Sequence, residues 1–317
     1  MSTTIESARA VHDIRMPLNN GHDEIPALGF GTLIAGSVET RAAVELAMEA
    51  GFRHFDCAER YGNEKEVGEA MQEVFRKGIV TREKMSVTTK LWNTNHRPDR
   101  VPRAFEASRK RLGLDYLDLY LIHTPFAFEP GDDQDPRDAS GHPIYDEGVT
   151  LLDTWNAMER LVENGSCKAI GVSDVTLEQT EEIFRSARIQ PAVVQVEAHP
   201  YWPQWDLLDF CKQHAIVMLA FAPLGHAIEP RLLDDPVITE VARTVGQAPS
   251  QVLLAWAIQR GTAVITTSTN PRHMEESFAV SALPEEAMKQ ISEGITSRVR
   301  LNAVVDSGVP GFIPRGK

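Results

Sequence analysis

Cysteine is scarce in this sequence. The 317 residues include only three cysteines, Cys57, Cys167 and Cys211, which lie far apart and form no Cys-x-x-Cys pair. This spacing argues against a disulfide framework and against a structural zinc site, so we expect no bound metal. The simplest interpretation is that all of these thiols are buried.

Basic residues are also in short supply. Lys and Arg together number 32, against 45 Asp and Glu, which gives a net charge of -13. Because nucleic-acid binding depends on clustered cations, we expect no nucleic-acid partner. The excess of negative charge favours solubility.

Long hydrophobic runs are absent as well. The longest notable apolar stretch, residues 215–222, falls well short of the ~20 residues that a helix needs to cross a bilayer. The first residues, MSTTIESARAVHDIRM, lack a cationic start followed by an apolar segment, so export is not expected. We therefore expect a cytoplasmic protein without a membrane partner, either a monomer or a weak homodimer.

What the sequence does contain is a regular alternation of two kinds of segment. Short apolar runs rich in β-branched or aromatic residues are each followed by a segment whose apolar residues recur at helical spacing. The predicted strands are 27–30, 53–57, 85–90, 116–123, 168–172, 192–196, 216–221 and 263–265. The predicted helices include 38–50, 64–77, 100–112, 151–164, 176–186 and 205–214. Such alternation is typical of parallel βαβ units.

The number of these units predicts the fold. Eight of them in one chain of this length favour a single α/β domain over residues 1–317, a closed (β/α)8 TIM barrel. Residues 13–26, with Asn-Asn-Gly at their centre, predict an N-terminal β-hairpin over the barrel floor. Residues 125–148 predict a long loop on the C-terminal face, either a lid or a mobile loop. The tail, 299–317, is expected either to close over the site or to be disordered.

Several chemically active side chains lie at or just after the ends of the predicted strands. They are Asp56, Lys90, His123, Gln195, Phe221 and Ser268. The carboxyl ends of barrel strands converge on one face, so these residues are predicted to form one site together with Tyr61. Each of them alone has a structural explanation, such as a solvated lysine or a core histidine. Their joint placement favours an active site.

These side chains together are suited to chemistry at the carbonyl group of a substrate. The ammonium of Lys90 is expected to lower the pKa of Tyr61 from its usual value of about 10 toward working pH. Asp56 is expected to keep Lys90 protonated, and a neutral His123 to orient a substrate carbonyl. These groups polarise and protonate a carbonyl oxygen but supply no electrons, so a cofactor must donate the hydride.

These segments resemble the signatures of the aldo-keto reductase family. The matching segments are GFRHFDCAERYGNE at 51–64, KLWNTNH at 90–96, LDLYLIHTP at 117–125, GVSD at 171–174, VVQVEAHPYW at 193–202, AFAPLG at 220–225 and VITTSTNPRHMEES at 264–277. They cover essentially the whole predicted barrel in family order. The resemblance implies an NADP(H)- or NAD(H)-dependent enzyme on a (β/α)8 barrel without a Rossmann motif, and the chain indeed has no Gly-x-Gly-x-x-Gly.

The resemblance also implies roles for individual residues. Tyr61 would be the general acid in reduction and the base in oxidation, with Asp56 and Lys90 tuning it and His123 orienting the carbonyl. The carboxamide of the nicotinamide would lie against Ser173, Asp174 and Gln195, and its ring against Phe221. The full set implied for the cofactor is Thr32, Ser173, Asp174, Gln195, Phe221, Pro223, Leu224, Ser268, Thr269, Asn270, His273, Glu276 and Ser277.

The chain departs from the family pattern in its cofactor residues. Asp174 stands where the family usually has Asn, so it accepts hydrogen bonds but donates none when ionised. Phe221 replaces a common Tyr and keeps its stacking surface. Thr267 and His273 stand where the family has the cations that bind the 2′-phosphate of NADP(H). Although the adjacent Arg272 is a possible substitute, we expect both cofactors to be used, with NAD(H) unusually competitive.

The substrate side is less well defined by the sequence. Trp92, Phe126, Phe128 and Trp202 follow predicted strands and are expected to form an apolar wall, although loop aromatics also pack lids. Leu33 stands where many family members have an aromatic residue. A roomier pocket is expected, and a bulky or alicyclic carbonyl compound fits it as well as a small aldehyde.

Two other functions stay open at this point. Asp56 and Glu197 are a possible carboxylate pair for a barrel glycosidase, although that function leaves Lys90, Tyr61 and His123 unexplained. A catalytically idle cofactor-binding sensor or regulatory subunit on the same fold is the other alternative, and it needs no Tyr61.

Overall fold

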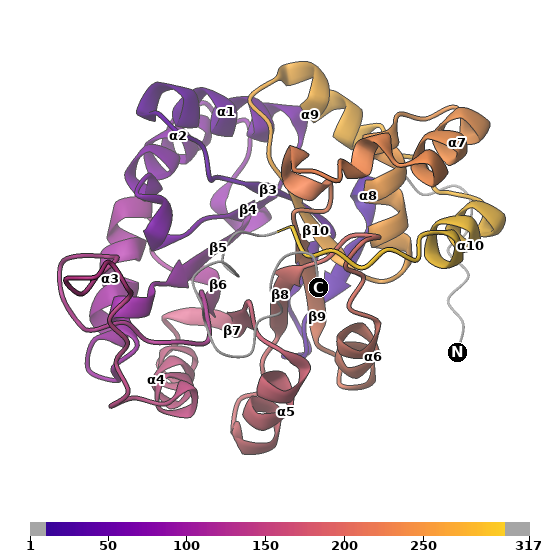
Figure 1. Ribbon diagram of the computed structural model, residues 1–317. Helices are drawn as coiled ribbons and strands as arrows, with labels where there is room; N and C mark the ends of the chain where they lie inside the picture. The colour runs from indigo at the N-terminus through magenta and orange to yellow at the C-terminus, as the bar shows by residue number, and fades with distance from the viewer. Residues whose placement is uncertain (1–10, 302–317) are drawn as a thin grey trace.

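Eight parallel strands close into a barrel in the computed structural model, which describes residues 11–301 (Figure 1). Around the barrel the strands run β3 (Leu28–Gly31), β4 (His54–Asp56), β5 (Ser86–Leu91), β6 (Leu117–Ile122), β7 (Cys167–Ser173), β8 (Val193–Glu197), β9 (Val217–Phe221) and β10 (Ala263–Thr266). β10 pairs with β3 and closes the ring. The predicted TIM barrel is confirmed, and each strand end lies within one residue of its prediction.

Helices surround the strands in Figure 1. They are α1 (Ser37–Ala50), α2 (Glu64–Arg76), α3 (Val101–Leu112), α4 (Leu151–Glu163), α5 (Leu177–Ser186), α6 (Trp205–Gln213), α7 (Pro236–Val245), α8 (Pro249–Gln259), α9 (Pro271–Phe278) and α10 (Glu285–Gly294). α1 to α6 match the predicted helices to within one residue at each end. Among the described residues, no helix has both the length and the apolar character needed to cross a membrane.

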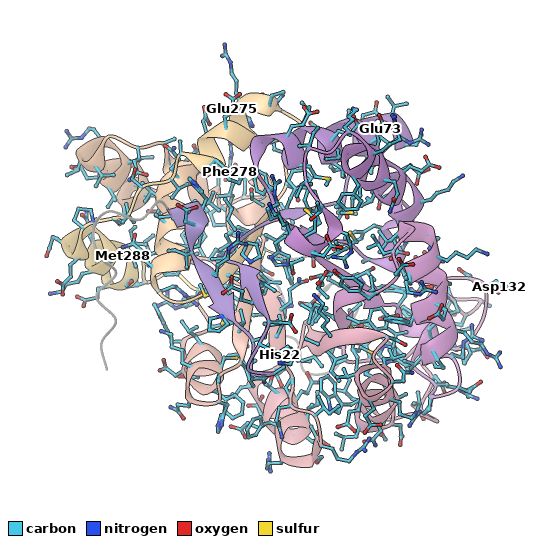
Figure 2. The ribbon with its side chains drawn as sticks, turned by 180° about the vertical axis from the view of Figure 1, so that it is seen from behind. His22, Glu73, Asp132, Glu275, Phe278 and Met288 are labelled. Carbon is cyan, nitrogen blue, oxygen red and sulfur yellow. The ribbon has the colours of Figure 1, made fainter. Side chains whose placement is uncertain are left out.

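A hairpin covers the barrel floor, as predicted for residues 13–26. Its strands, β1 (Arg15–Pro17) and β2 (Glu24–Pro26), pair antiparallel. Leu18 and Ile25 of this segment are buried in the cluster that includes Leu119 and Leu219 of the barrel strands. Figure 2 shows the molecule from behind, where His22 marks the turn of the hairpin. Since this end is closed by apolar packing, the open end lies at the carboxyl ends of the strands.

The core has two parts because the barrel strands are buried on both faces. A smaller cluster fills the barrel floor, while a larger one lies between strands and helices and includes Trp155 and Trp256. Gly171 of β7 shows how tightly the strands approach: a Cβ atom there would lie 2.2 Å from the carbonyl oxygen of Val193. All three cysteines are free thiols within the buried core, as expected.

The long loop at 125–148 has little regular structure but is tied to the barrel. Isolated bridges join Phe128 to Tyr145 and Arg137 to Pro143. Arg97 forms an ion pair of 2.7 Å with Asp146. These contacts fix the loop beside the ends of β5 and β6. The tail was predicted over 299–317, and the part after residue 301 lies outside the described residues.

Candidate active site

A buried ion pair occupies the centre of the barrel mouth. The Lys90 Nζ lies 2.6 Å from Asp56 Oδ2, and neither side chain has more than 4% of its surface exposed. Both residues come from strand ends, Asp56 from β4 and Lys90 from β5. Lys90 also donates to the Cys57 carbonyl at 3.0 Å, while Gln195 Nε2 of β8 donates to Asp56 Oδ1 at 2.7 Å. Each Asp56 oxygen therefore has a defined donor.

Tyr61 joins this pair from a short turn after β4. The turn spans Glu59–Tyr61 and ends at Gly62, whose φ of 69° is in the left-handed region that glycine adopts readily. This local turn brings the phenol oxygen of Tyr61 to 3.3 Å from Lys90 Nζ. The structure thus brings Asp56, Tyr61 and Lys90 into one connected group.

The lysine in this group is cationic. Burial disfavours an ammonium, but the charge and hydrogen bond of Asp56, together with Tyr61, outweigh that cost and raise the pKa of Lys90 above its usual value. A charged lysine in this position needs its carboxylate, because an unpaired buried charge is severely destabilising.

The expectation for the Tyr61 pKa is wrong. Burial of the phenol raises the pKa of Tyr61 to about 12, and the opposing effect of Lys90 is too small to reverse the shift. Desolvation disfavours the phenolate, and the nearby negative charge of Asp56 disfavours it further. Tyr61 is therefore a neutral phenol at working pH, with its proton in place.

His123 follows β6 and completes the group. Its ring centroid lies 5.8 Å from that of Tyr61 and 5.2 Å from that of Trp92, in edge-on arrangements. Burial, with the charges of Lys90 and Arg60, lowers the pKa of His123 well below its usual value. The imidazole is thus neutral, as predicted. Its Nδ1 is buried without a hydrogen-bond partner among the described residues.

Two cavities meet at this group. The first has a volume of about 300 Å³ and extends from Tyr61 and His123 toward β9 and β10. The residues predicted for the cofactor that line it are Ser173, Asp174, Gln195, Phe221, Pro223 and Leu224. Thr267 lines it as well, together with Gly31, Ala222, His226, Ile265 and Thr266, which were not predicted.

The other residues predicted for the cofactor lie outside this lining. Thr32 is fully buried and donates its hydroxyl to the Asp56 carbonyl at 3.0 Å. The remaining ones follow β10 on the surface, in the turn that leads into α9 and in the helix: Ser268, Thr269, Asn270, His273, Glu276 and Ser277. Asn270 caps α9 by accepting from the Arg272 backbone, and the Arg272 side chain is exposed.

The second cavity, of about 420 Å³, lies under the loop at 125–148. The predicted substrate residues Leu33, Trp92, Phe126 and Phe128 line it, with Arg60, Asn93, Thr124, Asp135, Arg137 and Pro143. Trp202 lines neither cavity, and its backbone pairs with that of His199 in a tight turn after β8. Within residues 11–301, no group of His, Cys, Asp and Glu is arranged to hold a metal ion.

Arg300 is a site residue that the sequence did not reveal. Its guanidinium contacts Asp174 Oδ1 at 3.1 Å and Glu197 Oε2 at 3.4 Å, and all three side chains are at most 9% exposed. Glu197 also accepts from His199 Nε2 at 2.9 Å. Asp56 and Glu197 are therefore each held in a different ion pair.

The sequence is similar to those of a family of known proteins. A sequence model of the Aldo/keto reductase family matches residues 27–295. The chain is 44% identical over 287 residues to Aldo/keto reductase slr0942 of Synechocystis, covering 87% of each chain. It is 42% identical over 306 residues to Dihydrodiol dehydrogenase 3 of Bos taurus, covering 92% of this chain and 94% of the relative. Identity to Aldo-keto reductase family 1 member A1 of Mus musculus is 41% over 279 residues, 84% and 85% of the two chains.

The ion pair predicts the effect of removing one partner. Lys90→Met is expected to lower the free energy of unfolding by about 3–5 kcal/mol, because Asp56 stays buried without its cation. Replacing both residues, as Lys90→Met with Asp56→Leu, is expected to cost less than the single change. Urea unfolding followed by tryptophan fluorescence measures both. Arg76→Met, which breaks an exposed pair with Glu73, is the control and should leave the urea midpoint unchanged. An unchanged midpoint for Lys90→Met would contradict this account.

Proposed function

Because this chain belongs to the aldo/keto reductase family, we propose that it catalyses reversible hydride transfer between a nicotinamide cofactor and an aldehyde, ketone or secondary alcohol. Family membership makes the protein an oxidoreductase and excludes the glycosidase alternative. The two carboxylates of that alternative, Asp56 and Glu197, are moreover each paired with a cation.

One observation supports the proposal above all others: Lys90 contacts both Asp56 and Tyr61, and Tyr61 lies where the cavities meet. Tyr61 and His123 line both cavities, so a carbonyl group in the second would lie within reach of both side chains. The first cavity suits the nicotinamide end of the cofactor, since it combines the aromatic side chain of Phe221 with the polar groups of Ser173 and Gln195. A sensor without catalysis would need no such proton donor.

Tyr61 serves as the acid in reduction. A bound nicotinamide cofactor supplies a hydride for the carbonyl carbon. As negative charge develops on the carbonyl oxygen, Tyr61 donates its proton there, and Lys90, 3.3 Å away, stabilises the phenolate left behind. The neutral His123 ring fixes the orientation of the carbonyl. In oxidation the same proton returns to Tyr61.

The choice of cofactor depends on the turn after β10. The family uses mainly NADP(H), whose 2′-phosphate needs cations. Here Thr267 is uncharged, and His273 is exposed on α9. We infer that NAD(H) competes unusually well, with the exposed Arg272 as the nearest cation in sequence to His273.

We also propose that the protein is a monomer or a weak homodimer. Within residues 11–301, the large hydrophobic residues that are exposed are Leu33, Val38 and Ile79. Leu33 belongs to the rim of both cavities, so it has a role apart from association.

Removal of the phenol hydroxyl tests the acid. Tyr61→Phe is expected to lower kcat for aldehyde reduction by about 10²–10⁴, because the proton donor is lost. The Kd for reduced cofactor, measured by quenching of tryptophan fluorescence, should stay within about threefold of wild type, since binding does not require this proton. Tyr116→Phe, at the opposite end of the barrel, is the matched control. Near-normal turnover by Tyr61→Phe would rule out its proposed role.

Two added cations test the cofactor preference. The wild type is expected to bind NADPH and NADH with Kd values within about tenfold of each other, because charge-assisted phosphate bonds are missing. Thr267→Lys and His273→Arg should each favour NADPH by about 10- to 100-fold. Glu285→Gln on α10, which also changes the net charge by +1, is the control for charge, and Arg272→Met reveals any phosphate contact from that residue. A wild type that binds NADPH more than about 100-fold more tightly than NADH would refute the inference.

A further inference from the structure

Arg300 comes from the segment after α10 and reaches the ends of two barrel strands. It pairs with Asp174, which follows β7, and with Glu197 at the end of β8. Its own backbone is fixed on both sides: Val299 N donates to the Tyr201 carbonyl at 3.0 Å, and Leu301 N donates to Glu197. In Figure 1 this yellow segment runs inward from α10 across the barrel. The guanidinium is therefore held in place by the fold.

Asp174 occupies a special position. It lines both cavities, as do Leu33, Tyr61 and His123, so it lies where they meet. Its φ of 54° is in the left-handed region, which is uncommon for a residue with a Cβ. Its amide donates to the Gln195 carbonyl at 2.9 Å, and this contact fixes the backbone. A side chain held in such a conformation at a cavity is a candidate for ligand recognition.

The two oxygens of Asp174 have different surroundings. Oδ1 accepts a hydrogen bond from Arg300 Nη2. Oδ2 accepts no hydrogen bond from another described residue, and it is not one of the fully buried oxygen atoms that lack a partner. Burial raises the pKa of Asp174 to about 7, and Arg300 opposes that shift. Without Arg300 the carboxyl would hold its proton more strongly and would no longer be a pure acceptor.

We propose that Arg300 is a positioning residue for the cofactor: by pairing with Oδ1 of Asp174, it holds Oδ2 as an acceptor for the carboxamide NH2 of the bound nicotinamide. This inference rests on the proposed function. The ionised Asp174 would also make the site prefer a ring substituent with an NH2 group, because a carboxylate accepts a hydrogen bond from NH2 but repels a carbonyl oxygen. The ring substituent must then present its nitrogen to Asp174, which fixes the rotation of the carboxamide and the pose of the ring.

A cofactor analogue without the NH2 group tests this directly. Reduced 3-acetylpyridine adenine dinucleotide replaces the carboxamide NH2 by a methyl group. At about pH 8.5, above the pKa of Asp174, the wild type is expected to bind NADH about 10- to 100-fold more tightly than this analogue, because the analogue leaves the Asp174 carboxylate unpaired. Arg300→Met should reduce this ratio at least about threefold, since the acceptor is no longer held. A merely structural role of Arg300 would weaken both ligands equally and leave the ratio unchanged.

Further variants keep the test decisive. Arg300→Lys retains the charge but not the planar guanidinium that contacts both carboxylates, so it should lower the ratio of NADH to analogue affinity in part. This variant replaces Arg300→Met in the test if Arg300→Met does not fold. In an Asp174→Asn background, Arg300→Met should no longer change the ratio, because a neutral amide needs no cation to remain an acceptor. Arg298→Met is the matched control, since among residues 11–301 that side chain bonds only the carbonyls of Ile295 and Ser297.

The outcomes separate the two proposals. Tight binding of NADH with an unchanged ratio in both Arg300 variants would overturn the role of Arg300 and leave the proposed function intact. Failure of the wild type to bind NADH, NADPH or the analogue would overturn the proposed function and this inference with it. A ratio that falls in the Arg300 variants but not in Arg298→Met is the expected result.

Discussion

The buried ion pair between Lys90 and Asp56 is the interaction on which the rest of the site depends. Two charges removed from water are tolerable only when each is fully paired, and here Gln195 and the Cys57 carbonyl supply the remaining bonds. The barrel provides this arrangement because residues distant in sequence meet at the ends of parallel strands. Once the ammonium is fixed, Tyr61 has a cation beside its oxygen, available when negative charge arrives there.

A second buried charge network, formed by Arg300, Asp174 and Glu197, lies next to the first, and its Asp174 lines the wall of the first cavity. Arg300 pairs with both Asp174 and Glu197, and Glu197 of β8 also accepts a hydrogen bond from the backbone of Leu301, next to Arg300. The site thus contains one cation for the proton donor and another for the wall of the first cavity. Each of these cations is paired in the described structure, so binding of a ligand need not create a new unpaired charge.

The sequence predicted most of this arrangement because strand ends and periodic helices are local signals. Tyr61 is five residues from Asp56, and the turn between them has local causes. Arg300 was missed because its partner Asp174 is 126 residues away, and no local pattern marks such a contact. The predicted direction of the Tyr61 pKa shift was wrong, because residue types reveal a neighbouring lysine but not the degree of burial. Burial has the larger effect on this pKa. Trp202 followed a strand but entered a tight turn with His199.

The central claim is that a neutral Tyr61, held beside the cationic Lys90, gives its proton as hydride arrives. Single-turnover reduction of an aldehyde at saturating reduced cofactor, followed by absorbance at pH values from about 8 to 10, where Asp174 is ionised, tests it most directly. An acid must be protonated to act, so the rate falls only above its pKa, which is about 12 for Tyr61. We predict a rate constant that changes less than about twofold over this range. A rate that falls about tenfold per pH unit above neutrality would contradict the account.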